Sequence, residues 1–209
     1  MAEVAAPVGR RERTRRRLLD AARELITEKG VAGLRIQEIT EGAGVALGSF
    51  YNHFASKEEL VEAVVGESLS ALAETVSRPT GADQDPAELV SNAIRRFVAR
   101  AYEDPDFARL VVHLEHADAL FMSAVWPAAH AALEEGVAAG RLKPLQVDLA
   151  VTTILGGALS LMRAIVDGRI GPGAETAYAE MCLRALGLPA RQAAAVANRP
   201  LPPLVDATG

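Results

Sequence analysis

The residues with the most distinctive chemistry are six arginines that fall within eight positions near the N-terminus. Positions 10–17 hold these six arginines against one acid, Glu12, which gives the stretch a local charge of +5. Guanidinium groups bind phosphate oxygens through charge-assisted and often bidentate hydrogen bonds. The cluster therefore predicts contact with the phosphates of a nucleic acid. A solvated helix face remains the alternative interpretation.

A second group, in the C-terminal half, has the residue types of a metal site: His113, Glu115, His116, Asp118 and His130. Residues at i and i+3 share a helix face, so His113 and His116 lie close enough to act together. No third ligand is fixed by the spacing, and no HExxH motif is present. We therefore expect no metal and no cofactor, and we interpret these side chains as surface or pocket groups.

Motifs of common enzyme classes are missing from the sequence. It contains neither a GxSxG nucleophile elbow nor a P-loop. Glycines at 42, 44 and 48 superficially suggest a dinucleotide loop, but Leu47 stands where the third glycine is required, and the segment follows a helical pattern. We therefore expect a protein that is not an enzyme. A helical enzyme or small-molecule carrier with an incidental basic arm is the alternative.

The composition is that of a globular chain with an uneven charge distribution. The 209 residues are 50% hydrophobic and 23% charged, and the net charge is −5. Residues 1–60 carry 10 basic and 9 acidic side chains, whereas residues 61–209 carry 12 and 18. The acidic total, which argues weakly against a nucleic-acid partner, therefore describes the second part of the chain and not the first.

Cysteine usage and hydropathy indicate a cytoplasmic protein. The single cysteine, Cys182, rules out an intrachain disulfide, and an unpaired thiol is compatible with a reducing compartment. The longest charge-free stretch of the C-terminal half, residues 149–162, is shorter than the roughly 20 residues of a membrane-spanning helix. The N-terminus lacks the apolar core of a secretory signal. We expect no membrane partner.

Helical periodicity and capping signals predict an all-α chain of about nine helices. Ser56 with Glu59 forms a capping box, and the pairs Asp85-Pro86 and Asp104-Pro105 are typical helix starts. No strand pattern is found. The expected helices cover residues 18–29, 36–43, 46–54, 57–77, 86–102, 104–114, 120–139, 147–168 and 174–187. We expect a linker at 78–86 and disordered tails at 1–9 and 199–209.

The segment 34–54 has the pattern of a helix-turn-helix. Two short helices flank Gly44, which can adopt the positive φ of a tight turn. Apolar residues stand on both sides of it, with Ile39 before the turn and Phe50 after it. The second helix of such a motif projects side chains into the DNA major groove.

The first 65 or so residues resemble the DNA-binding domain of the TetR family of bacterial transcriptional regulators. The resemblance is carried by the opening helix 18–30, Ile39, Ala43-Gly44-Val45, Gly48, Tyr51, His53-Phe54 and residues 56–60. Beyond about residue 70 only the helical architecture is similar. The resemblance implies a three-helix DNA-binding domain at 10–56, a connecting helix at 57–77, and a ligand-binding and dimerisation domain at 86–197.

The resemblance also implies roles for residues around the motif. Tyr51 and His53 stand where the family commonly contacts the DNA backbone, and Lys57 begins the next helix near a phosphate. Arg35 and Ala46 replace the usual N-capping residues of the two short helices, and the loss of one such cap lowers helix stability by about 1 kcal/mol. Thr40 replaces the usual Ala. Arg35 can act instead as a phosphate clamp. The predicted DNA-binding residues are Arg10, Arg11, Arg13, Arg35, Ala46, Leu47, Gly48, Ser49, Tyr51, Asn52, His53 and Lys57.

Aromatic and sulfur side chains are scarce but gather in three consecutive helices of the C-terminal half. They predict either plain core or a mostly apolar cavity with a few polar groups, among them His116 and Arg163. In the TetR family, helices at this place commonly enclose an effector pocket, which implies a small apolar or amphipathic ligand. The predicted ligand-binding residues are Phe97, Tyr102, Phe107, Leu110, His113, Leu114, Phe121, Met122, Trp126 and Met162.

The helices expected at 147–168 and 174–187 are apolar on more than one face, which exceeds what packing on one side requires. Gly156, Gly157 and Ala158 would permit close helix approach. The resemblance implies a four-helix interface in a homodimer; burial within one chain is the alternative. The expected function is a ligand-responsive repressor that binds a near-palindromic operator as a dimer. A regulator that acts through a protein partner without an effector is a further alternative.

Overall fold

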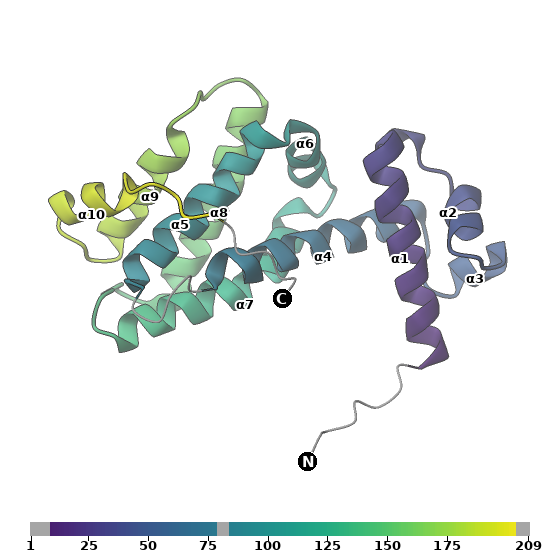
Figure 1. Cartoon of the computed structure of the whole chain (residues 1–209), viewed down its shortest axis with the longest axis horizontal. Helices are drawn as coiled ribbons and strands as arrows, with labels where there is room; N and C mark the ends of the chain where they lie inside the picture. Colours follow the sequence, from purple (N-terminus) through teal and green to yellow (C-terminus); the bar gives the residue numbers. More distant parts are fainter. Residues whose placement is uncertain (1–8, 79–83, 204–209) are drawn as a thin grey trace, which may run out of the picture. The chain divides into compact units, whose positions relative to one another are not determined.

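All regular secondary structure in the residues that the computed structural model describes, 9–78 and 84–203, is helical (Figure 1). The chain divides into two compact units, residues 1–65 and 66–209, with the boundary inside α4. The elements are α1 (Arg10–Lys29), the 3₁₀ turn η1 (Val31–Gly33), α2 (Ile36–Gly42), α3 (Leu47–Tyr51), α4 (Lys57–Ser77), α5 (Pro86–Glu103), α6 (Pro105–His113), α7 (Ala117–Ala138), α8 (Val147–Val166), α9 (Ala174–Ala185) and α10 (Ala190–Ala197).

The first unit is a small helical domain whose core holds α3 in place. Phe50 of α3 is fully buried, and its ring lies 5.9 Å from that of Phe54. The helices α1 and α2 cross closely, since a Cβ at Gly42 would lie only 3.3 Å from the Cβ of Ala21. Small residues at this crossing therefore let α2 pack closely on α1, and α3 in turn packs on α2.

The start of α4 uses the predicted capping box. The Glu59 amide donates to the Ser56 hydroxyl at 3.1 Å, and the Glu59 carboxylate accepts from the Ala55 amide at 2.6 Å. These bonds satisfy amide groups that the first helical turn leaves without intrahelical partners. The capping box thus fixes where the chain leaves α3 and enters α4.

The second unit is built around α5, which packs against α6, α7, α8, α9 and α10. Both predicted Asp-Pro starts are confirmed. The Asp85 carboxylate accepts from the Ala87 amide at 3.0 Å, and that of Asp104 accepts from the Phe107 amide at 3.1 Å. Helices α7 and α8 pack on each other beside α5, so a cluster of three helices forms the interior of this unit.

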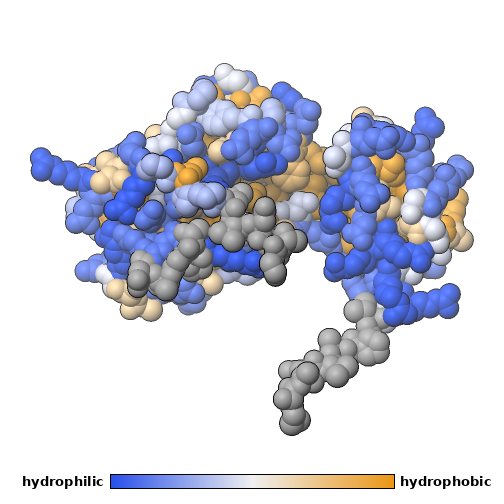
Figure 2. Space-filling model, in the orientation of Figure 1, coloured by the Kyte–Doolittle hydropathy of each residue, from blue (hydrophilic) through white to orange (hydrophobic). Residues whose placement is uncertain are grey.

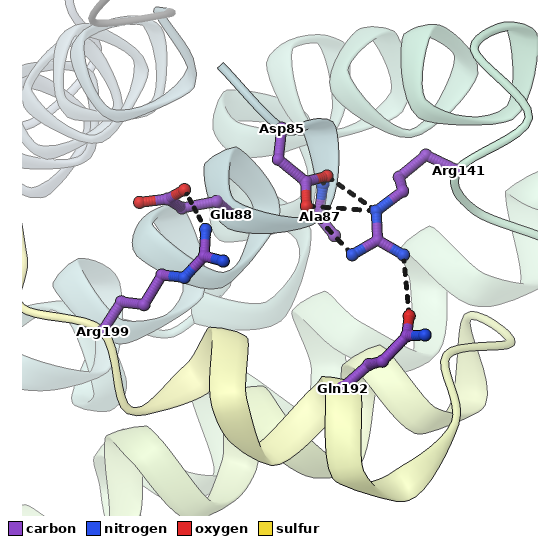
Figure 3. Close-up of polar contacts among 6 residues, drawn as sticks. All are labelled: Asp85, Ala87, Glu88, Arg141, Gln192 and Arg199. Carbon is purple, nitrogen blue, oxygen red and sulfur yellow. Dashed lines mark hydrogen bonds and ion pairs between the residues drawn. The ribbon is translucent and has the colours of Figure 1, made fainter.

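A polar network ties the N-terminus of α5 to α10 and to the segment after α7 (Figure 3). Arg141 forms a bidentate pair with Asp85, at 2.8 and 2.9 Å, and donates to Gln192 at 3.2 Å. Arg199 pairs with Glu88 at 2.7 Å. The Arg141 guanidinium lowers the pKa of the Asp85 carboxyl. The network thus joins three segments that are far apart in the sequence.

The predicted all-α class is confirmed, and several details differ from the expectations. Helix α1 begins at Arg10 rather than at residue 18, so the arginine cluster is part of the helix. Helix α10 was not predicted, because the only signals for it are the preceding Pro189 and a short alanine-rich run. Helix α7 begins at Ala117 rather than at residue 120. The tail expected from residue 199 is held against α5 as far as Pro202, since Arg95 and Arg96 donate to the carbonyls of Arg199 and Pro202. The other expected tail and linker residues, 1–8, 79–83 and 204–209, lie outside the described residues.

A further difference concerns α8, which is long and apolar enough to span a membrane by length and composition. The charge-free stretch between Asp148 and Arg163 excluded such a helix on length alone, but the full helix has 20 residues and tolerates both charges near its ends. Its most apolar window is 44% buried inside the protein. Part of its apolar surface is therefore used in the core, and the remainder is exposed.

Candidate DNA interface, cavity and apolar face

Helix α3 exposes large side chains on its outer face and buries its inner face in the domain core. Leu47 is 52% and Tyr51 58% exposed, whereas Phe50 between them is fully buried. Ala46 occupies the N-cap position without a side-chain hydrogen bond, as expected for alanine. A helix with an exposed outer face and a buried inner face is suited to enter a DNA groove.

A wide basic groove of about 940 Å³ lies between α1 and α3. The described residues that line it include four arginines and no carboxylate, and the surface over the N-terminal end of α1 is hydrophilic (Figure 2). The structure thus brings together a majority of the predicted DNA-binding residues: Arg10, Arg11, Arg13, Ala46, Ser49, Asn52 and His53. An anion such as a phosphodiester would be attracted to this groove.

The remaining predicted residues of this unit lie outside the groove. Leu47, Gly48 and Tyr51 are exposed on α3, and Arg35 is exposed at the N-cap position of α2. Arg35 makes no side-chain capping bond, as the sequence predicts. Lys57 is half-buried as the first residue of α4. Their contacts with DNA stay predictions.

Arg17 is a residue of this site that sequence reasoning missed. Its Nε donates to the Ala43 carbonyl at 2.8 Å, and its Nη2 donates to the Gly44 carbonyl at 2.7 Å. Gly44 has a φ of +60°, and a Cβ there would lie 3.5 Å from Arg17 Nη2. Arg17 therefore pins the turn between α2 and α3 to α1. The sequence shows its charge, but its acceptors lie in a later segment that only the fold brings beside α1.

The second unit contains an apolar cavity of about 50 Å³ between the end of α4 and helices α5, α7 and α8. The rings of Phe97 and Phe121 form an edge-to-face pair beside it, with centroids 5.9 Å apart. The described lining residues are Ser77, Val90, Ala93, Ile94, Phe97, Phe121, Val125, Ala129, Ala132, Leu133, Ile154, Leu155 and Ala158. Their arrangement suits a small apolar ligand.

Of the predicted ligand-binding residues, Phe97 and Phe121 line this cavity, and the others lie elsewhere. Tyr102 donates its hydroxyl to the Gly171 carbonyl, Phe107 lies beside Arg100, and Trp126 stacks on His130. Met162 is buried, Leu110, Leu114 and Met122 are half-buried, and His113 is exposed. Residue type predicts burial, but only three-dimensional packing decides which side chains face one cavity. Small residues such as Ala129 and Ala132, which create the space, gave no signal in the sequence.

Helices α8 and α9 expose an apolar face, which includes a groove of about 320 Å³. Leu149 is 56% and Met181 59% exposed, and Leu145 before α8 is fully exposed. Apolar side chains gathered on one surface are typical of a protein–protein interface. We call Leu145, Leu149 and Met181 the apolar face.

Gly157 has a different role from the one expected. A Cβ at this position would overlap the Tyr178 hydroxyl oxygen, so the glycine makes room for the Tyr178 ring within one chain. That hydroxyl donates to the Ile154 carbonyl at 2.7 Å. Among the described residues, no other atom lies within 4 Å of a Cβ placed at Gly156, so this glycine can still permit the close approach of another helix, as expected. The neighbouring Cys182 is buried, and burial raises the pKa of its thiol to about 11.

The histidines of the C-terminal half are engaged locally. His130 lies 3.4 Å from Glu134 and 3.1 Å from Asp148, and His113 Nδ1 lies 2.9 Å from the Arg109 carbonyl. In the part of the chain that the structure describes, no three His, Cys, Asp or Glu side chains are placed to hold a metal ion.

Two family descriptions match the chain. Residues 85–199 match "Tetracyclin repressor-like, C-terminal domain", and residues 18–64 match "Bacterial regulatory proteins, tetR family". Among curated proteins, the repressor DhaR of Mycobacterium sp. (strain GP1) is 41% identical over 63 residues, and KstR2 of Mycobacterium tuberculosis is 42% identical over 62 residues. These matches span 30% of this chain and about a third of each relative, 32% and 30%.

Solved structures extend the similarity over nearly the whole chain. RolR in complex with resorcinol has a TM-score of 0.79 and 33% identity, over 93% of this chain and 98% of that chain. RolR without ligand has a TM-score of 0.76 and 32% identity, over 91% and 100%. FadR of Bacillus subtilis in complex with stearoyl-CoA has a TM-score of 0.59 and 19% identity, over 81% of this chain and 98% of that chain. At this identity only the fold is shared.

Proposed function

Because the chain belongs to the TetR family of bacterial transcriptional regulators, we propose that it is a cytoplasmic repressor released from its operator by a small ring-containing effector. The observation that carries this proposal is the basic groove, which lies directly beside the exposed face of α3. Two repressors among its curated relatives, DhaR and KstR2, are similar to it in this region. The chain is a regulator rather than an enzyme; its repression, operator and effector are proposed.

DNA binding combines two kinds of contact. The arginines of the groove contact phosphates and fix the position of the domain, while residues exposed on α3, such as Leu47 and Tyr51, reach toward base edges or the backbone. Phosphate contacts supply affinity that does not depend on sequence, and α3 supplies discrimination. Arg17 contributes by fixing the angle at which α3 is presented.

The operator is bound by a homodimer. The apolar face on α8 and α9 pairs with the same face of a second copy, which removes Leu149 and Met181 from water. A two-fold axis then presents two copies of α3 to successive major grooves, about 34–36 Å apart. A near-palindromic operator follows from this symmetry.

The effector occupies the cavity of the second unit. RolR, which is 33% identical to this chain, was solved with resorcinol, a single-ring compound, and the cavity here is small and mostly apolar. Its wall includes Ser77, the last residue of α4, and α4 begins just after the helix-turn-helix. A ligand that prefers one position of α4 shifts the protein between states of different DNA affinity.

Binding of the full chain to DNA from upstream of its own gene, measured over a range of salt concentrations, tests this proposal. The logarithm of affinity should fall steeply with the logarithm of salt, with a slope of about −0.9 for each phosphate contact. Replacing Arg10, Arg11 and Arg13 with alanine should make the slope shallower. Tyr51→Ala should weaken binding to the operator. Arg191→Ala, which removes an exposed arginine of α10, is the matched control and should leave the slope unchanged. Equal slopes for the triple variant and the control would overturn the proposed role of the groove.

A further inference from the structure

Helix α3 carries no charged or amide side chain. Its five residues are Leu47, Gly48, Ser49, Phe50 and Tyr51, and Phe50 is fully buried. The side chains that read guanine or adenine through two hydrogen bonds are arginine, lysine, asparagine and glutamine, and α3 contains none of them. The four arginines of the neighbouring groove belong to α1. Base recognition by α3 itself therefore depends on apolar contact and on hydroxyl groups.

Gly48 lies in the middle of the exposed side of α3. At about 100° per residue, it stands between Leu47 and Asn52, the exposed residue that follows the helix. Apart from its chain neighbours and its own helix backbone, no atom that the structure describes lies within 4 Å of a Cβ placed at Gly48. Its backbone is helical, where alanine is more stable than glycine. The fold therefore does not require this glycine, which instead leaves room for another molecule to approach the α3 backbone.

Leu47 is the side chain placed to make an apolar contact on this side. It is 52% exposed at the start of α3, one helical turn before Tyr51. In the major groove, thymine presents an apolar 5-methyl group, whereas guanine and cytosine edges present polar groups. An exposed leucine is stabilised when that methyl group covers it, because both leave water. The adjacent basic groove attracts the phosphates that would bring DNA to this face.

From these observations we propose that α3 reads its operator by apolar contact, with Leu47 packed on the 5-methyl group of a thymine in each half-site. Gly48 supplies the clearance that lets the base edges come close enough. The inference rests on the DNA-binding part of the proposed function and specifies the base chemistry that it recognises. It assigns Leu47 as a residue that determines sequence specificity and Gly48 as a positioning residue. The operator then has an A·T pair opposite Leu47 in both half-sites.

Removal of the methyl groups from the DNA tests the inference with the full-length protein. The duplex from upstream of the gene is prepared with thymine and, separately, with deoxyuridine at every thymine position. Uracil keeps the base pairing and lacks only the methyl group. The protein should bind the thymine form at least about fourfold more tightly, which is the gain from burying one methyl group. Equal affinity for the two forms would overturn the inference.

The variant Leu47→Ala assigns the methyl contact to one side chain. It should weaken binding to the thymine form and remove most of the difference between the two forms, as a double-mutant cycle between leucine and methyl group requires. Val137→Ala, at an exposed valine of α7, is the matched control and should keep the full difference. An unchanged ratio of the two affinities in Leu47→Ala would contradict the role of Leu47.

The variant Gly48→Ala separates clearance for DNA from a structural need for glycine. It should weaken binding to the upstream duplex by at least about fivefold, since one carbon too many in a packed contact is destabilising. The melting temperature should stay the same or rise, because the added Cβ meets no other described segment and alanine favours the helix. Unchanged DNA affinity, or a lowered melting temperature, would contradict the role of Gly48.

The inference and the proposed function fail in distinguishable ways. If the protein prefers the upstream duplex over a random duplex but binds the thymine and deoxyuridine forms equally, the methyl contact fails and specific DNA binding stands. If it does not distinguish the upstream duplex from the random one, the proposed function fails, and the inference fails with it.

Discussion

The two units of this protein achieve binding in opposite ways. In the first unit, the groove residues come from one stretch, positions 10–53; they are mostly exposed, and their charged members are four arginines. In the second unit, the cavity is assembled from four helices that span positions 77–158, and its lining is apolar. Recognition of a polyanion needs charge on a local rigid motif, whereas recognition of a small ring needs space created by distant segments. Because the two kinds of site are built differently, we expect the two units to tolerate different substitutions.

The largest effect is expected from truncating a buried phenylalanine in each unit. Phe50→Ala should lower the free energy of unfolding by about 3–5 kcal/mol and abolish DNA binding, because Phe50 is the base on which α3 rests. Phe121→Ala should enlarge the cavity, admit larger rings and retain DNA binding. Urea unfolding and DNA titration of both variants provide the comparison. Full operator affinity in Phe50→Ala would remove the distinction between the units.

The next effect concerns the apolar face. Leu149→Glu places like charges opposite each other across the proposed two-fold axis, so the dimer should dissociate and operator affinity should fall by at least about tenfold. Sedimentation velocity measures the assembly state. Ala119→Glu, at an exposed position of α7, is the control and should remain dimeric. A dimeric Leu149→Glu would place the interface elsewhere.

Arg17 tests whether the first unit depends on fixed geometry as well as on charge. Arg17→Ala leaves two turn carbonyls without their donor and should lower the free energy of unfolding by about 1–3 kcal/mol. Arg16→Ala removes the same charge from an exposed neighbour and should leave the melting temperature within about 1–2 °C of the parent protein. Thermal unfolding distinguishes the two variants. Equal melting temperatures would show that the Arg17 bonds add nothing to the turn.

The smallest effect concerns the Asp85–Arg141 pair of the second unit. Asp85→Asn keeps a helix-capping side chain but removes the ion pair, and should cost about 1 kcal/mol near pH 7. The pKa of the Asp85 carboxyl is lowered from 3.8 in the folded protein. The stabilisation by the ion pair is therefore fully present above pH 3.8, and it is lost as the pH falls through the lower pKa that Asp85 has in the folded protein. Unfolding curves of both proteins should differ by a constant amount from pH 5 to 8 and converge below pH 3.8. A difference that persists unchanged at low pH would show that the ion pair is not its source.

The sequence predicted much of the first unit because its signals are local. The capping box at Ser56 and the glycine at the turn determine their helices through neighbours a few residues away. The Asp-Pro starts in the second unit were predictable for the same reason. Most of the cavity lining was not: Phe97 and Phe121 were predicted and line it, whereas Tyr102 and Trp126 have the residue types of a pocket but contact Gly171 and His130 instead. The cavity lining, the bonds of Arg17 and the role of Gly157 all depend on partners in other helices or turns, which no local pattern identifies.

Competition between two DNA duplexes tests the central claim most directly. The full-length protein is titrated, at moderate salt, into a labelled duplex from upstream of its own gene and into a random duplex of equal length. The account predicts at least about a thousandfold tighter binding to the upstream duplex, which is the low end of the typical range for specific over non-specific binding. Equal affinity for the two duplexes would contradict it.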